Sequence, residues 1–185
     1  YTITYSATDA SGNAATQVTR TVTVVDTTAP IVVVTGDNPA TVELGSTYVD
    51  AGATAMDAFH GDTNVVSSGT VDTSTVGTYT ITYSATDIDN NTATASRTVN
   101  VVDTTSPVIT LTGDASVTVE LGDTYTDAGA TATDASGAIT VTSSGTVDTA
   151  TVGTYTITYS ATDASGNAAT QVTRTVTVVD TTAPV

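Results

Sequence analysis

Aspartate side chains in predicted turns are the groups of this sequence best suited to bind a ligand. Asp26 and Asp103 occupy the same place in two copies of the segment VVDTT, 77 residues apart. Hard cations take carboxylate and carbonyl oxygens from flexible loops, and clustered carboxylates repel one another unless a cation neutralises them. We therefore predict Ca²⁺ where repeats meet, with candidate ligands Asp26, Asp57, Asp87 and Asp89 at one junction and Asp103, Asp134 and Asp163 at the next. The alternative is plain turn chemistry, because an aspartate in a turn readily accepts hydrogen bonds from its own backbone.

Catalytic groups are sparse. His60 is the only histidine and occurs in only one repeat, so a Ser–His–Asp triad cannot recur along the chain. A histidine in a surface loop is the simpler interpretation. The acidic residues recur in turns, which favours a solvated or metal-linked role over the paired carboxylates of a glycosidase. The chain has no cysteine, which excludes disulfides, zinc–thiolate sites and thiol nucleophiles. We expect that the protein is not an enzyme.

The charge balance excludes several kinds of partner. The 185 residues carry a net charge of −16, with three arginines and no lysine. Nucleic acid is therefore not an expected partner, because phosphate binding needs clustered Lys and Arg, and an anionic membrane surface would repel the chain. The longest aliphatic run, Ile31–Val34, is far too short to cross a bilayer, so we expect no membrane insertion.

The aspartates must be positioned by β-strands. The segment Tyr79–Asp87 reads YTITYSATD and appears three times. Its odd positions are apolar or aromatic and its even positions are small and polar, which is the alternation of a half-buried strand. The run Gly77-Thr78-Tyr79 is similar to the tyrosine corner of immunoglobulin-like sandwiches, whose core cysteine is replaced here by Ile81. We predict that Tyr79 packs beneath a two-sheet unit.

The chain is organised as tandem repeats of about 77 residues. Turn signals every 8–12 residues predict seven short strands per repeat, and the expected fold is all-β, with tandem immunoglobulin-like Greek-key β-sandwich repeats. The expected boundaries are an incomplete repeat of two strands at 1–28, complete repeats at 29–105 and 106–182, and the start of another at 183–185. A lone hairpin is marginal in water, so we expect residues 1–28 to be completed by preceding residues or by a neighbouring chain.

This topology brings candidate ligands from distant segments together. The first strand of a repeat and the turn of its last hairpin share one pole of the sandwich. Asp103 is therefore expected to approach the turn Asp163–Asn167, with Asp134 joining them. The equivalent set at the earlier junction contains an additional acid, and its loop after Asp57 holds Phe59 and His60, where the later repeat has Ser136 and Gly137.

The motifs DTTAP, TGD, VELG, DAGA and TVGTYTITYSATD together resemble the bacterial surface Ig-like repeats of large secreted proteins, and the hairpin with ATDASGN also resembles hyalin-type repeats. The resemblance covers both complete repeats and the partial one. It implies an extracellular, stalk-forming module at a bacterial cell surface. Such modules occur in adhesins, biofilm-matrix proteins and multidomain secreted hydrolases.

One arginine per repeat falls on an inward-facing strand position, at Arg20, Arg97 and Arg174. Either it forms a buried ion pair, with Glu43 or Glu120 as the candidate partner, or a β-bulge turns it outward into water. We predict the bulge.

The expected function is a non-enzymatic structural repeat that forms a stiff stalk or fibre through contacts between adjacent repeats. Pro30 and Pro107 restrict the linker backbone, which favours stiffness. One alternative is a self-assembling extracellular filament subunit whose incomplete repeat is completed by a strand from another chain. Another is an accessory carbohydrate-binding module of a secreted hydrolase, for which Tyr48, Tyr125 and Phe59 are the candidate stacking aromatics.

Overall fold

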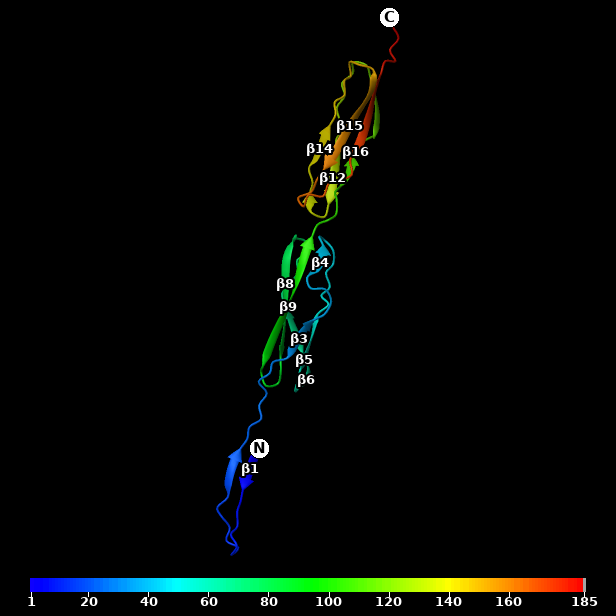
Figure 1. Cartoon of the computed structure of the whole chain (residues 1–185). Helices are drawn as coiled ribbons and strands as arrows, with labels where there is room; N and C mark the ends of the chain where they lie inside the picture. Colours follow the sequence, from blue (N-terminus) through cyan, green and yellow to red (C-terminus); the bar gives the residue numbers. More distant parts are fainter. Residues whose placement is uncertain (185) are drawn as a thin grey trace. The chain divides into compact units, whose positions relative to one another are not determined.

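The computed structural model describes residues 1–184, which form β-strands and no helix (Figure 1). The strands are β1 Thr2–Tyr5, β2 Val18–Thr21, β3 Ile31–Val34, β4 Ala40–Glu43, β5 Ala53–Asp57, β6 Gly61–Thr63, β7 Val65–Ser68, β8 Gly77–Thr86, β9 Thr92–Val102, β10 Val108–Leu111, β11 Ser116–Glu120, β12 Ala130–Asp134, β13 Gly137–Ala138, β14 Val141–Ser144, β15 Gly153–Ala161 and β16 Val172–Val179. Within this range there is therefore no apolar helix of a length that could span a bilayer. Val185, expected to belong to a following repeat, lies outside the described residues.

Strands β10 to β16 form a two-sheet sandwich. One sheet has the order β10-β12-β13 and the other β11-β16-β15-β14, and every pairing is antiparallel except the parallel β11–β16 pair. The two sheets share one apolar core, in which Ile109 of the first sheet clusters with Ile157, Tyr159 and Val176 of the second. Alternate residues of β15 and β16 are buried, as period-two patterning requires.

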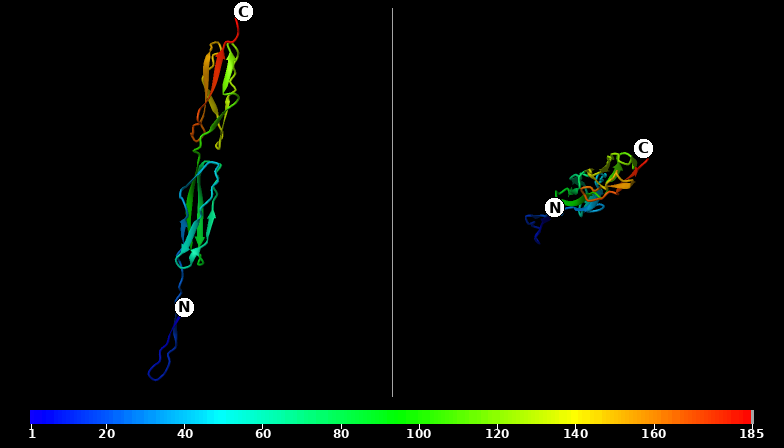
Figure 2. Two further views of the ribbon diagram at one scale, coloured as in Figure 1. Left: turned by 90° about the vertical axis from the view of Figure 1, so that its right-hand side faces the viewer. Right: turned by 90° about the horizontal axis from the view of Figure 1, so that it is seen from above.

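The hairpin β1–β2 shows that burial depends on the other strands of the repeat. Residues 1–30 are identical to residues 155–184. Tyr5 is nevertheless 48 % exposed, whereas its counterpart Tyr159 is 1 % exposed. The described residues give β1 only β2 as a partner, in a two-stranded sheet (dark blue in Figure 2). The same sequence therefore forms the same hairpin, and the apolar face is covered only where a second sheet packs on it.

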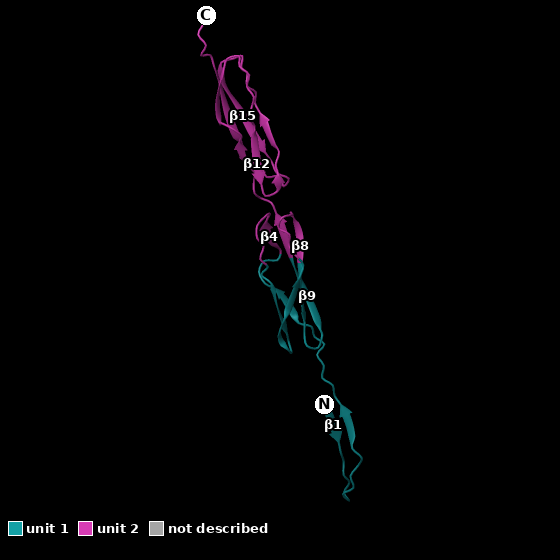
Figure 3. Ribbon diagram, turned by 180° about the vertical axis from the view of Figure 1, so that it is seen from behind, with its two compact units in different colours: residues 1–38, 50–69, 81–97 teal, residues 39–49, 70–80, 98–185 magenta. Residues whose placement is uncertain are grey.

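The strands from β3 to β9 follow the same plan, with sheets β3-β5-β6 and β4-β9-β8-β7 and one parallel pair, β4–β9. The predicted all-β fold of tandem Ig-like sandwiches is confirmed. Two compact units divide the chain differently from the repeats. The first contains residues 1–38, 50–69 and 81–97, and the second contains 39–49, 70–80 and 98–185 (Figure 3).

The predicted tyrosine corner is present in both complete repeats. The hydroxyl of Tyr79 donates to the carbonyl oxygen of Thr75 at 2.9 Å, and Tyr155 makes the same bond to Thr151 at 2.9 Å. Both rings are half-buried. The ring lies over the glycine two residues earlier, where a Cβ on Gly77 would meet the Tyr79 ring at 3.7 Å, an ordinary van der Waals contact.

The prediction that the arginines turn outward at a bulge is wrong. Arg97 and Arg174 are 2 % and 1 % exposed. Arg174 lies in an unbroken antiparallel ladder opposite Ile157, so its side chain keeps the inward parity of the strand. Its guanidinium pairs with Asp127, and Arg97 pairs in the same way with Asp50, with 2.9 Å between Nη1 and Oδ1.

Backbone carbonyls complete the environment of the buried Arg174. Arg174 donates to the carbonyl oxygens of Thr112 and Gly129, and through Nε to that of Asp114 at 2.9 Å. Tyr159 donates its hydroxyl to Asp127 at 2.7 Å, which fixes the counterion. A buried charge needs a partner and satisfied hydrogen bonds, and this network supplies both.

Candidate metal centres

Asp103, Asp134 and Asp163 converge as the topology predicts. One carboxylate oxygen from each lies within 4.8 Å of one from each of the others. Asp103 directly follows β9, Asp134 ends β12, and Asp163 comes two residues after β15. All three belong to the second compact unit, and Asp103 and Asp163 are each 8 % exposed. Three segments far apart in sequence therefore present carboxylates to one point.

Local hydrogen bonds hold these carboxylates but leave one buried oxygen unsatisfied. Asp163 accepts from the backbone and side-chain nitrogens of Asn167, each at 2.8 Å, and Asp134 accepts from the Ser136 N–H at 2.7 Å. Asp103 Oδ2 accepts from Ser165 Oγ at 3.0 Å, while its Oδ1 is buried with no hydrogen-bond partner. Burial raises the pKa of Asp163, but the hydrogen bonds from Asn167 outweigh it and hold the pKa below its ordinary value. Asp163 is therefore ionised at neutral pH, in a site short of positive charge.

The second cluster consists of Asp26, Asp57, Asp87 and a residue that sequence reasoning left out, His60. One ligand atom from each of the four lies within 4.8 Å of the others, and all belong to the first compact unit. Asp57 ends β5 and is 2 % exposed. Asp89, a predicted ligand of this junction, is not a member of the four. It lies instead beside His60, with Oδ2 3.2 Å from Nε2.

The turn after β5 brings His60 into the cluster. Asp57 Oδ1 accepts from the backbone N–H groups of Phe59 at 2.8 Å and His60 at 2.9 Å, which folds the loop back on the carboxylate. These N–H donors, that of His60 first, hold the pKa of Asp57 below its ordinary value. The His60 side chain is 24 % exposed and its Nδ1 lies 3.4 Å from Asp26 Oδ2 and 3.4 Å from Asp57 Oδ1. The expectation of an ordinary surface histidine therefore misses its neighbours.

Two carboxylate oxygens of this cluster have no hydrogen-bond partner although they are buried. They are Asp26 Oδ2 and Asp57 Oδ2. The Asp87 oxygens both accept from Asn91, each at 2.8 Å, as Asp163 does from Asn167. The amide nitrogen of each asparagine also reaches the linker carbonyl, of Asp26 at 3.3 Å in one case and of Asp103 at 3.1 Å in the other. The same turn thus positions both the hairpin aspartate and the linker aspartate.

The two glutamates accept hydrogen bonds from the linkers and do not pair with the arginines. Glu43 accepts hydrogen bonds from the backbone N–H and the hydroxyl of both Thr104 and Thr105, at 2.8 to 3.0 Å. Glu120 repeats this arrangement with Thr181 and Thr182.

The strand register explains this correction. Glu43 pairs with Val102, the last residue of β9, which lies next to the linker, whereas Arg97 lies in the middle of that strand. The hydrogen bonds from the Thr104 N–H and the Thr105 hydroxyl lower the pKa of Glu43. Each repeat therefore fixes the direction in which the chain leaves its last strand.

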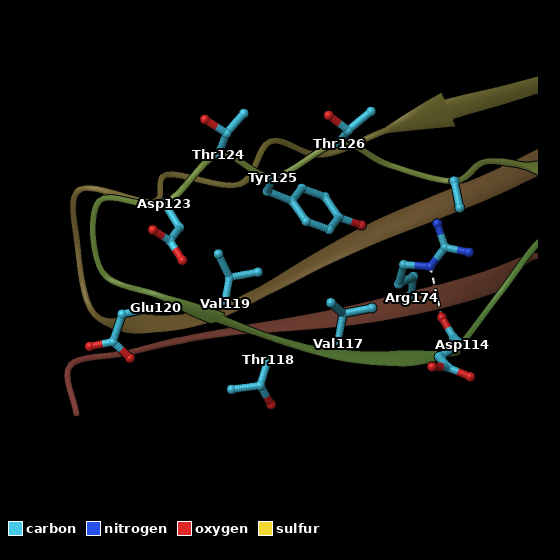
Figure 4. A pocket seen from close by; sticks show the side chains of 11 residues that line it. Asp114, Val117, Thr118, Val119, Glu120, Asp123, Thr124, Tyr125, Thr126 and Arg174 are labelled. Carbon is cyan, nitrogen blue, oxygen red and sulfur yellow. Dashed lines mark hydrogen bonds between the residues drawn. The ribbon is translucent and has the colours of Figure 1, made fainter. Parts of the chain in front are cut away.

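The aromatic candidates for stacking on sugar have other contacts. A pocket beside β11 is lined by Tyr125, Val117, Val119 and Arg174 (Figure 4). The Tyr125 ring packs against the core, and its hydroxyl donates to Asp127 at 3.1 Å. Phe59 is 75 % exposed but meets the His60 ring edge-on, with 4.9 Å between the centroids. The Tyr125 ring is therefore engaged by its own repeat, whereas Phe59 remains largely open to solvent.

The family model described as bacterial surface protein, Ig-like domain matches residues 32–101 and again residues 109–178. The chain belongs to this bacterial surface Ig-like family. Its repeats are thus extracellular-type structural modules, of the kind indicated by their sequence motifs.

This chain also resembles segments of longer proteins. Hyalin of the sea urchin Strongylocentrotus purpuratus is 36 % identical over 198 residues, which cover 98 % of this chain and 16 % of the relative. Hyalin of Lytechinus variegatus is also 36 % identical, over 98 % of this chain and 37 % of the relative. The crystal structure of a lipoprotein from Bacteroides thetaiotaomicron is 34 % identical over 42 % of this chain and 40 % of its own, with a TM-score of 0.38. The chain thus spans well under half of the length of each.

Proposed function

We propose that this chain is a non-enzymatic segment of a stiff stalk or fibre on a bacterial surface protein, such as an adhesin or a biofilm-matrix protein. Family membership supports the surface location. The observation that supports stiffness is hydrogen bonding of the linker on two sides. Glu43 accepts hydrogen bonds from Thr104 and Thr105. Ser165 and Asn167 donate hydrogen bonds to Asp103. A linker bound on both sides has few conformations left to sample.

Calcium at the Asp103, Asp134 and Asp163 cluster completes this proposal. The ligand atoms are all oxygens, which suit a hard cation, and they come from a linker, a strand end and a hairpin turn. The buried Asp103 Oδ1 has no hydrogen-bond partner, so a cation there would satisfy an oxygen that otherwise costs desolvation energy. Bound Ca²⁺ would tie the linker to the repeat that follows it.

Calorimetric titration of the whole chain with Ca²⁺ tests this proposal. The expected result is binding that Asp103→Asn abolishes at this cluster, with a melting temperature that Ca²⁺ raises and the chelator EGTA returns to its starting value. Asp123→Asn is a matched control, since it removes one exposed carboxylate outside the cluster. If Asp103→Asn and the unaltered chain take up the same Ca²⁺ with the same affinity, the calcium site is wrong.

A further inference from the structure

The cluster of Asp26, Asp57, His60 and Asp87 differs in chemistry from the one formed by Asp103, Asp134 and Asp163. Its ligand atoms include an imidazole nitrogen, whereas the other cluster offers oxygens alone. Imidazole suits zinc and its neighbours in the first transition row, while carboxylate and carbonyl oxygens suit calcium and magnesium. His60 is also the only histidine of the chain, so this difference is confined to one junction.

We propose that Asp26, Asp57, His60 and Asp87 form a site for a borderline transition-metal dication of the Zn²⁺ class, with His60 Nδ1 as its nitrogen ligand. The inference rests on the proposed role of bound metal ions in stiffening the junctions between repeats, and it assigns a different ion to this junction.

The spacing of the ligand atoms fits such an ion. Two ligands that each lie about 2.1 Å from a tetrahedral zinc are separated by about 3.4 Å. His60 Nδ1 lies 3.4 Å from Asp26 Oδ2 and 3.4 Å from Asp57 Oδ1. Both separations match this spacing, and the ligand atoms of all four residues lie within 4.8 Å of one another.

Buried oxygens without partners point independently to a bound cation. Asp57 Oδ2 belongs to a side chain that is fully buried, and it accepts no hydrogen bond. Asp26 Oδ2 is equally unsatisfied on a side chain that is 10 % exposed. A buried carboxylate oxygen with no donor carries a large desolvation cost, which coordination to a metal removes.

Asp89 prepares His60 for this role. Its Oδ2 lies 3.2 Å from Nε2, on the opposite side of the ring from the cluster. When Nδ1 holds a metal, the ring proton is on Nε2 and Asp89 is its acceptor, which is the arrangement of carboxylate–histidine–zinc triads. Phe59 packs edge-on against the imidazole. The equivalent of Asp89 in the later repeat is Ser165, which instead donates to the linker aspartate Asp103.

A solvent opening lies next to the site. The hollow is lined by Val24, Val25, Asp26, Phe59 and Asp89. Two of its five lining residues carry carboxylates, so an approaching cation meets a negative entrance.

Nitrogen-15 NMR of the whole chain gives a direct test, because a single histidine produces a single set of imidazole signals. Titration with Zn²⁺ should shift the His60 Nδ1 resonance, and titration with Ca²⁺ should leave it in place. The variant His60→Gln should lose at least tenfold in Zn²⁺ affinity, measured by calorimetry, because it lacks the nitrogen ligand. Asp89→Ser, which installs the residue of the later repeat, should lose about tenfold, since residues that orient a ligating histidine typically contribute that much.

Two controls separate this site from the calcium proposal. Asp103→Asn should leave Zn²⁺ binding at His60 unchanged, and His60→Gln should leave the Ca²⁺ uptake that depends on Asp103 unchanged. If Zn²⁺ leaves the imidazole signals unmoved, or if His60→Gln binds Zn²⁺ as tightly as the unaltered chain, His60 is only an ion-pair partner of its aspartates. That result would overturn the zinc site without touching the calcium site.

Discussion

Removing either partner of the buried pair between Arg174 and Asp127 should destabilise the repeat at 106–182, and removing the aspartate should lower its free energy of unfolding more. Arg174 is 1 % exposed, whereas the Asp127 side chain is 27 % exposed. Asp127→Ala therefore leaves a guanidinium in the core without its counterion. Breaking a buried pair in this way costs about 3–5 kcal/mol, and the partial exposure of Asp127 places the expected value near about 3 kcal/mol.

Arg174→Met leaves a different set of unsatisfied groups. The carbonyl oxygens of Thr112, Gly129 and Asp114 each lose a donor, at about 1 kcal/mol each, while the buried methionine side chain returns about 1 kcal/mol or more of apolar transfer energy. Asp127 itself can turn toward water. The net cost is about 2 kcal/mol. The matched control is Arg20→Met, the same residue in an identical sequence, where the arginine is exposed and the change should stay within about 0.5 kcal/mol.

Differential scanning calorimetry on the whole chain measures these effects. The repeat at 106–182 is expected to melt as a transition of its own. For a domain of this size, about 3 kcal/mol corresponds to a fall in melting temperature of about 12–24 °C, and about 2 kcal/mol to about 8–16 °C. A smaller fall for Asp127→Ala than for Arg174→Met would refute the argument from unequal burial. Falls no larger than that of Arg20→Met would show that the pair contributes nothing.

Two further predictions concern the tyrosine corner and the hydrogen bonds between Glu43 and the linker. Tyr155→Phe removes the bond to Thr151 and should cost about 1 kcal/mol, whereas Tyr1→Phe, at an exposed position of identical sequence, should cost nothing measurable by thermal melting. The threonine partners of Glu43 lower its pKa. The hydrogen bonds from the linker to Glu43 should therefore be complete above its ordinary pKa of 4.5 and be lost as the pH falls through the lowered pKa. The NMR chemical shift of the Thr104 amide measures this loss. A Thr104 amide shift that does not change through that pH range would contradict these hydrogen bonds.

Features that depend on local pattern and topology could be predicted from the sequence. Alternation fixed the buried face of the strand beginning at Tyr79, and the sandwich topology alone was enough to place Asp103 beside Asp163. The partner of Arg97 could not be read in this way, because Asp50 lies in an irregular segment before β5 where no periodicity indicates its direction. His60 was missed for a similar reason. Its position follows from two backbone hydrogen bonds to Asp57, which composition and spacing do not reveal.

Solution X-ray scattering with and without Ca²⁺ tests most directly the claim that metal at the linker stiffens the array. The account predicts that EGTA shortens the maximum dimension and broadens the distance distribution of the unaltered chain, and that Asp103→Asn shows the broad distribution even in saturating Ca²⁺. Scattering curves that superimpose under all of these conditions would contradict it.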